Sequence, residues 1–280
     1  MTRFFDPHIH MYSRTTDDYQ NMAVAGIEVI VQPSFWLGSP RTNVGTFVDY
    51  WEHMISFETL RAKEFGIDHY VCISVNPKES VVRPLALDAL KTMVNGKYHL
   101  RDRVVAIGEI GYNLINNEEE ELFVKQLDLA NKENLLVMIH LPHNNKPEGM
   151  KRMTQVFKSG NYNFQKILID HNTEETVKDT LDLGAWGGLS VYPKTKLSPE
   201  RVIQMVKNFG SERLMVNSAA DWGVSDPLSV PLTALEMRKQ GCDSTDIENI
   251  TFNNAFNFYK QSSKFEWNPR HKGQGTRERK

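Results

Sequence analysis

Two histidines close to the start of the chain, His8 and His10, follow a short apolar run. Alternate residues of a β-strand share one face, so both imidazoles are expected to reach one metal ion. Further residues of metal-binding type occur much later, and each follows its own strand-like run. These later candidates are Glu109, His140, His171 and Asp221.

Together the candidates supply four imidazoles and two carboxylates, the nitrogen and oxygen donors preferred by zinc, manganese, iron or magnesium. A closed zinc site uses only about four ligands. We therefore expect one or two divalent metal ions, or one ion with catalytic partners. Two further residues, His143 and Lys194, are candidate substrate contacts, with exposed loop side chains as the alternative interpretation.

The elements that must position these residues are eight short apolar runs separated by polar or helical stretches. Helical periodicity is clear over 119–133 and 199–209. The alternation predicts a single-domain α/β protein, a (β/α)8 TIM barrel. An open doubly wound sheet is the alternative, but a histidine pair stands where that fold commonly carries a glycine-rich loop. The predicted strands are 4–10, 26–32, 69–75, 104–110, 135–140, 166–171, 185–191 and 214–217.

The candidate ligands lie at or just past the carboxyl ends of these predicted strands, where a parallel barrel builds its active site. A long aromatic segment, 36–64, is expected to form an enlarged loop plus a helix over the second strand, with its aromatic residues packed in the core. We place the barrel in residues 1–263. The basic, apolar-poor segment 264–280 is expected to be a frayed tail.

The formal net charge of −2 among 280 residues gives no general reason to expect affinity for nucleic acid or membranes. No apolar run reaches the ~20 residues that a membrane span requires. The two cysteines, Cys72 and Cys242, lack disulfide-like spacing, which favours a reducing compartment and a cytoplasmic location. The expected partner is a small-molecule substrate.

Several motifs make the chain resemble the TatD-like metal-dependent hydrolases, a branch of the amidohydrolase superfamily of (β/α)8 barrels. The resemblance extends from residue 4 to about residue 260. Its motifs are Asp6-x-His8-x-His10, Gly108-Glu109-Ile110-Gly111, Gln126-Leu-x-Leu-Ala130, Ile139-His140, Asp170-His171, Asp221 and Asn253-Asn254-Ala255-Phe256.

The resemblance implies that His8, His10 and Asp221 hold one ion. It implies that His140 and His171 hold the other and that Glu109 bridges the two. The implied activity is hydrolysis of an ester or phosphoester bond by a metal-activated hydroxide, with Asp221 carrying the proton. A lactonase or amidase, or a non-catalytic metal-binding component of a metabolite-processing assembly, are the alternatives.

Two departures from the family pattern concern substrate contacts more than metal contacts. Asn113 stands where many relatives have an aspartate after the Gly-Glu-Ile-Gly motif. Ala219 and Ala220 precede Asp221, where relatives carry Glu-Thr before the final aspartate. A nucleic acid substrate is possible for the family, but nuclease activity is not inherited by this chain on resemblance alone.

Overall fold

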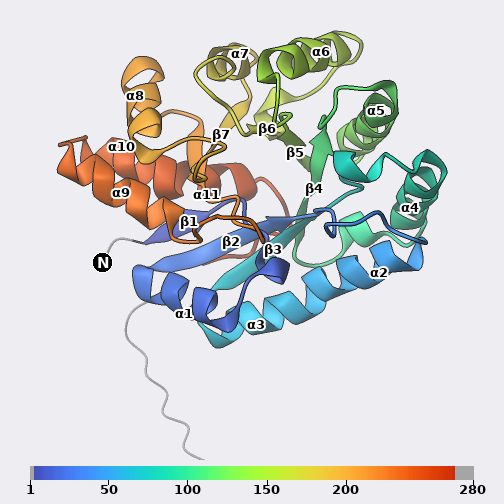
Figure 1. Cartoon of the computed structure of the whole chain (residues 1–280), viewed down its shortest axis with the longest axis horizontal. Helices are drawn as coiled ribbons and strands as arrows, with labels where there is room; N and C mark the ends of the chain where they lie inside the picture. Colours follow the sequence, from blue (N-terminus) through green and yellow to red (C-terminus); the bar gives the residue numbers. More distant parts are fainter. Residues whose placement is uncertain (1–2, 269–280) are drawn as a thin grey trace, which may run out of the picture.

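The computed structural model describes residues 3–268. Eight parallel strands form one sheet in which each strand pairs with the next in sequence, and helices surround it (Figure 1). The strands are β1 (Phe4–Asp6), β2 (Ile27–Pro33), β3 (Asp68–Ile73), β4 (Val104–Gly111), β5 (Leu136–His140), β6 (Ile167–Asp170), β7 (Trp186–Ser190) and β8 (Leu214–Asn217). The α-helices are α1 (Thr16–Ala25), α2 (Gly45–Glu52), α3 (Thr59–Glu64), α4 (Arg83–Asn95), α5 (Asn117–Lys132), α6 (Lys146–Lys158), α7 (Val177–Asp182), α8 (Pro199–Phe209), α9 (Ser229–Lys239), α10 (Ser244–Glu248) and α11 (Asn254–Tyr259).

The barrel closes between β1 and β8 through hydrogen bonds between the segments that follow these two strands. The His10 amide donates to the Ala220 carbonyl, and the Ala219 amide donates to the His8 carbonyl, each over 2.8 Å. The predicted (β/α)8 barrel is thereby confirmed. Among the described residues, no helix is both long and apolar enough to cross a membrane.

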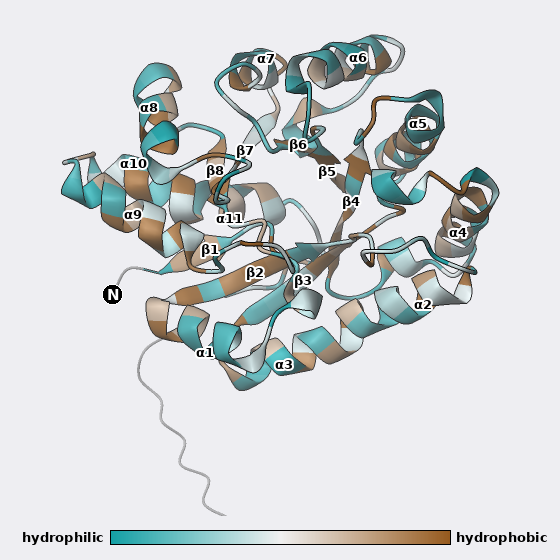
Figure 2. Cartoon of the chain, viewed as in Figure 1, coloured by the Kyte–Doolittle hydropathy of each residue, from teal (hydrophilic) through white to brown (hydrophobic). Residues whose placement is uncertain are grey.

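Burial explains why the apolar runs form strands. Every residue of β4 is buried, and the strands are the most hydrophobic part of Figure 2, whereas the helices also carry hydrophilic residues. Helix α8 buries Val202, Ile203 and Val206 and begins at Ser198, whose side chain accepts from the Arg201 amide. Both predicted helices, 119–133 and 199–209, are present as α5 and α8.

The first strand is shorter than predicted, because β1 ends at Asp6 rather than at His10. Pro7 follows directly and has no amide to donate to a neighbouring strand. The chain nevertheless continues beside β2, since the Ile9 amide donates to the Val31 carbonyl over 3.0 Å. His8 and His10 are therefore held by an extended segment beyond the strand.

The aromatic segment 36–64 forms a loop followed by one helical run. Helix α2, a π-helical stretch (His53–Glu58) and α3 follow one another without a break. Phe47, Tyr50 and Trp51 are buried, as expected for a helix packed on the barrel. Trp36, in contrast, is only partly buried and lies on the loop.

Part of the segment predicted as a tail is packed in the structure. Phe265 and Trp267 are buried near the amino ends of the strands. The Phe265 ring stacks on Phe5 with centroids 5.9 Å apart, and Trp267 lies 5.4 Å from Phe252. Residues 269–280, for which the frayed tail stays a prediction, lie outside the described residues.

Candidate metal centre

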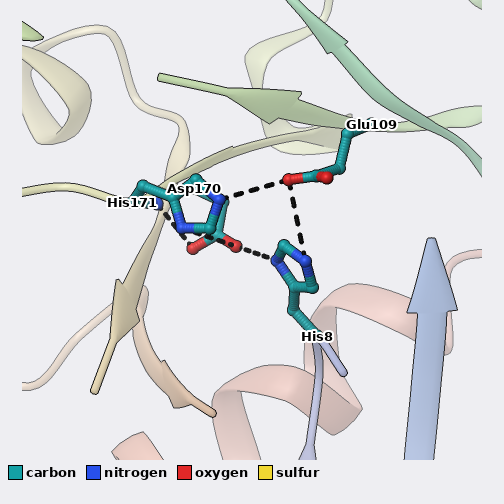
Figure 3. Close-up of side chains that lie close together, drawn as sticks. All are labelled: His8, Glu109, Asp170 and His171. Carbon is teal, nitrogen blue, oxygen red and sulfur yellow. Dashed lines mark hydrogen bonds and ion pairs between the residues drawn. The ribbon is translucent and has the colours of Figure 1, made fainter. Parts of the chain in front are cut away.

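Four buried side chains converge at the carboxyl ends of the strands (Figure 3): His8, Glu109, Asp170 and His171. One ligand atom from each lies within 4.8 Å of all the others. Donors bound to one ion at about 2.1 Å are separated by at most about 4.2 Å, so only a small adjustment would bring them onto a common ion.

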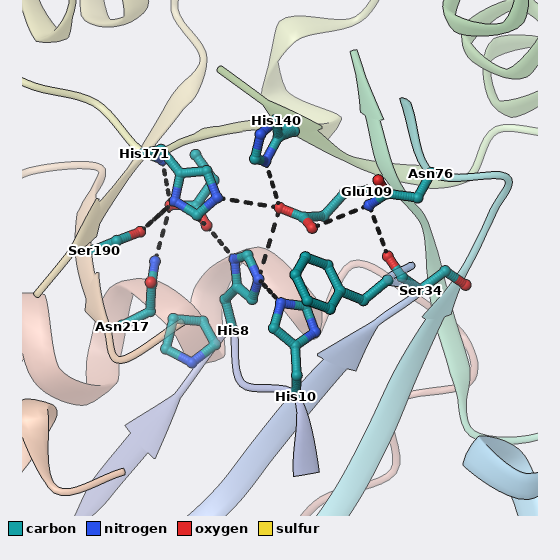
Figure 4. Close-up of polar contacts among 12 residues, drawn as sticks. His8, His10, Ser34, Asn76, Glu109, His140, His171, Ser190 and Asn217 are labelled. Carbon is teal, nitrogen blue, oxygen red and sulfur yellow. Dashed lines mark hydrogen bonds and ion pairs between the residues drawn. The ribbon is translucent and has the colours of Figure 1, made fainter. Parts of the chain in front are cut away.

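Glu109 is the centre of the arrangement. Its Oε1 lies 2.9 Å from His140 Nδ1, 3.2 Å from His171 Nε2 and 3.6 Å from His8 Nε2. Its other oxygen, Oε2, accepts from Asn76 Nδ2 over 3.4 Å (Figure 4). One carboxylate thus faces three imidazoles from three different parts of the barrel, which suits a bridging ligand.

His10 extends the cluster on the side of β2. Its Nε2 lies 3.0 Å from His8 Nε2, so two imidazole nitrogens face each other in a buried space. The Phe35 ring stacks on His10 at a centroid distance of 4.1 Å and restricts the orientation of the imidazole. A cation near both nitrogens would satisfy two lone pairs that otherwise oppose one another.

Supporting groups orient these side chains. His171 Nδ1 lies 2.6 Å from Ser190 Oγ. The Asp170 carboxylate contacts His8 Nδ1 (Figure 3) and accepts from Asn217 Nδ2 over 2.9 Å. Such partners on the second ring nitrogen fix which nitrogen of a histidine is free for a metal.

The protonation states also suit metal binding. Burial lowers the pKa of His10, His140 and His171, which keeps their imidazoles neutral. Burial opposes ionisation of Glu109, but the nearby His8 and His140 hold the pKa of its carboxyl well below the usual value. Neutral imidazoles and ionised carboxylates are the forms that coordinate metals.

The residues present therefore fit one or two divalent ions. Two buried carboxylates in one cluster need positive charge nearby, because unpaired buried charges are costly. Glu109 and Asp170 raise the pKa of His8 against the effect of burial, so the surroundings of this imidazole favour a positive charge, which a bound cation would supply. The donors are of nitrogen and oxygen type, which leaves the identity of the metal open.

Asp221 lies apart from these four residues. It is partly buried in the loop after β8, four residues past the strand end, and its Oδ1 accepts from Tyr192 Oη over 2.8 Å and from the Gly223 amide over 2.7 Å. Within residues 3–268, no hydrogen bond or ion pair joins its carboxylate to the histidines. Its role as a metal ligand stays a prediction. The second carboxylate found beside the histidines, in addition to that of Glu109, is that of Asp170.

The two predicted substrate contacts differ in their surroundings. His143 is exposed, and burial together with the charges of Lys196, Lys146 and Lys78 lowers its pKa, so it shares the mouth of the barrel with three lysines. Lys194 is exposed in the loop after β7. The lysine of this loop that reaches the cluster is Lys196, whose Nζ lies 3.2 Å from His171 Nδ1.

Comparison with known proteins agrees with this geometry. The sequence model of the family described as TatD related DNase matches residues 5–260. The chain belongs to this family. An uncharacterized metal-dependent hydrolase of Methanocaldococcus jannaschii is 28% identical over 264 residues, covering 91% of this chain and 99% of the relative.

Solved structures share the fold. A TatD-like protein from Archaeoglobus fulgidus superposes with a TM-score of 0.68 at 23% identity, covering 88% of this chain and 99% of that one. The phosphotriesterase homology protein from Escherichia coli gives a TM-score of 0.66 at 13% identity, covering 92% and 99%. With the family established and a fitting donor cluster present, this TatD-family chain is a metal-dependent hydrolase.

Proposed function

We propose that this TatD-family hydrolase cleaves an ester bond of a small molecule, and that the bond is a phosphoester. The observation that carries the choice is the group of lysines around the cluster: Lys78, Lys146 and Lys196. A phosphate ester is anionic, so cations beside the metal site would attract it. Three lysines at the mouth supply that attraction.

Lys196 is the nearest of the three to the candidate ligands, through His171. Lys78 is partly buried, and the negative charges of Glu109 and Asp221 act on its ammonium. Lys146 is buried at the start of α6, where its Nζ donates to the Pro142 carbonyl over 3.0 Å. Burial lowers the pKa of Lys146 to about 7, so an anion nearby would favour its charged form.

The E. coli phosphotriesterase homology protein, which shares the fold, holds phosphate in its active site. In phosphoester hydrolysis the oxygen of water forms a bond to phosphorus, the bond from phosphorus to the alcohol oxygen breaks, and the alcohol leaves with a proton. Bound divalent ions would supply Lewis acidity and lower the pKa of water. The overall charge of −2 does not support a nucleic acid substrate, so we keep a small molecule.

In this proposal, Lys196 and Lys78 hold the phosphoryl oxygens, and Asp221 carries the proton. The charge of Asp221 acts on both Lys78 and Lys196, which supports this assignment. The Tyr192 hydroxyl and the Gly223 amide hold the carboxylate in one orientation. An oriented carboxylate at that position can accept a proton from water and return it to the leaving alcohol.

The test uses protein loaded with manganese or zinc and three substrates with one leaving group: 4-nitrophenyl phosphate, bis(4-nitrophenyl) phosphate and 4-nitrophenyl acetate. Glu109→Gln serves as the inactive control. Turnover of a phosphate ester that depends on Glu109 supports the proposal. Turnover of the acetate alone would favour the lactonase or amidase alternative. If none of the three substrates is hydrolysed although metal is bound, the non-catalytic metal-binding component is favoured.

A further inference from the structure

We propose that a pocket beside the metal cluster binds an apolar alcohol portion of the substrate, so that the substrate is a phosphate ester with an apolar body. This inference rests on the proposed phosphoesterase function. The pocket has a volume of about 360 Å³, within the range of small-molecule sites. The residues that the argument uses are Trp36, Phe47, Lys78, Val81, Val82 and Leu85.

The pocket lies at the same end of the barrel as the candidate ligands. Three of its lining residues follow successive strands: Trp36 follows β2, Lys78 follows β3 and Asn113 follows β4. Loops after neighbouring parallel strands meet at one end of the barrel. The pocket is therefore built from the loops that surround the mouth of the site.

Two direct connections join the pocket to the cluster. Asn76 donates to Glu109 Oε2 and also begins the 3-10 helix Pro77–Glu79, which carries Lys78. On the other side, Phe35 stacks on His10, and the Trp36 ring follows it in sequence and lies 6.5 Å from it. A molecule with one end at Glu109 and His10 therefore has the pocket beside it.

The walls of the pocket include apolar side chains that are exposed to water. Val81 is 63% exposed and Val82 is 41% exposed. Trp36 and Leu85 are partly buried, and Phe47 is buried beneath them. Covering such surface with an apolar group is favourable by roughly 25 cal/mol for each Å² removed from water.

Charge determines which end of the substrate enters the pocket. Arg41, also in the wall, is paired with Glu79, so that its charge is already balanced. Lys78 makes no ion pair among residues 3–268, and its Nζ lies 4.9 Å from the Trp36 ring centroid. Within the described residues, Lys78 is thus the cation of the wall that has no ion-pair partner, and it lies two residues after Asn76, which donates to Glu109. An anionic group is expected at the Lys78 side and an apolar group beyond it.

The experiment measures equilibrium binding to the metal-loaded protein and needs no turnover. The probes are methylphosphonate, 1-naphthylmethylphosphonate and 2-naphthol; the carbon–phosphorus bonds of the phosphonates resist hydrolysis. The test variant is Val82→Asp, which places a charge in the pocket at a helix N-cap where aspartate is well tolerated. Val24→Asp, at an 82% exposed valine on α1, is the matched control.

We expect wild type and Val24→Asp to bind the naphthyl phosphonate at least about tenfold more tightly than methylphosphonate, or about 1.4 kcal/mol. Val82→Asp should lose most of that advantage while binding methylphosphonate normally. An equal advantage in all three proteins, or none in wild type, would overturn the pocket assignment. If phosphonates do not bind but 2-naphthol binds in a manner sensitive to Val82→Asp, the pocket stands and the phosphoesterase proposal fails.

Discussion

At the level of single residues, the structure places two aspartates in different surroundings, and the sequence points to Asp221 and not to Asp170 as a ligand. Asp170 contacts His8 in the cluster, whereas Asp221 is held by Tyr192 and Gly223 outside it. We expect Asp170→Asn to weaken metal binding about 10–100-fold, because it loosens a ligand or the partner of one. Asp221→Asn should keep the metal and lose turnover.

Metal content after dialysis and competition titration with a chelator measure the first effect, and steady-state kinetics measure the second. Metal loss in Asp221→Asn, with full retention in Asp170→Asn, would show instead that Asp221 is the ligand implied by family resemblance.

Lys196 and Lys194 form a natural pair for testing phosphate recognition. Lys196 lies against His171, while Lys194 is exposed in the same loop. A hydrogen bond to a charged group contributes about 1.5–3 kcal/mol. Lys196→Met should therefore lower kcat/KM for a phosphate ester by at least about tenfold and have little effect on a neutral acetate ester. Lys194→Met should match wild type; equal losses in both variants would remove the special role of Lys196.

From sequence, Asp170 is noted only as part of the Asp170-His171 motif and is not named as a candidate ligand. In a regular strand, Asp170 and His171 would point to opposite faces. The strand instead ends at Asp170, and His171 has a left-handed φ of 62°, which brings both side chains to the cluster. Lys196 was missed because the loop returns towards β7, where the Leu197 amide donates to the Ser190 carbonyl.

At the level of elements, the sequence predicts the eight strands because their buried apolar runs are bounded by polar stretches. Errors occur where a single residue changes the ladder, as at Pro7 after β1. Helix positions follow from periodicity, but the pocket could not be predicted. Its walls come from the connections after β2, β3 and β4, including residues of α2 and α4, and these are far apart in sequence.

His69 connects three elements and makes their stability depend on pH. This residue of β3 is buried, with Nε2 3.0 Å from Gln32 Oε1 of β2 and Nδ1 3.1 Å from Thr59 Oγ1 of α3. Burial lowers its pKa to about 3. Below the unfolded pKa of about 6.5, the unfolded chain takes up a proton that the folded chain does not, so stability falls as pH decreases towards 3.

The effect is about 1.4 kcal/mol per pH unit, or about 2 kcal/mol at pH 5. His69→Gln should therefore lose about 2 kcal/mol less than wild type between pH 8 and pH 5. Urea unfolding at both pH values, at equal metal content, measures the difference; parallel losses would argue against a neutral buried His69.

At the level of the whole molecule, the two ends of the described chain close the barrel opposite the site. Arg3 lies over Phe252 and Trp267, and Phe265 packs on Phe5 and Tyr70. Phe265→Ala should cost about 3–5 kcal/mol of stability, as expected for a buried aromatic residue, without changing kcat. Phe57→Ala, at a 53% exposed phenylalanine, should change stability by less than about 0.5 kcal/mol.

Thermal and urea unfolding give the stability of both variants, and the nitrophenyl assay gives kcat. A change in kcat for Phe265→Ala would mean that packing at the closed end is coupled to the mouth. If Phe57→Ala loses as much stability as Phe265→Ala, the loss is not specific to the packing of Phe265 at the closed end of the barrel.

The candidate ligands and the pocket are held by different parts of the same scaffold. His140, Glu109 and Asp170 belong to strands, and His8, His10 and His171 lie in the segments directly after β1 and β6. Trp36 lies instead in the connection after β2, and Lys78 and Val82 lie in the connection after β3, where Val82 is the N-cap of α4. Mutations can therefore accumulate in these two connections without replacing a member of the donor cluster. A lineage built on this scaffold is free to change its substrate while keeping its metal, and substrate range should diverge among relatives faster than metal dependence.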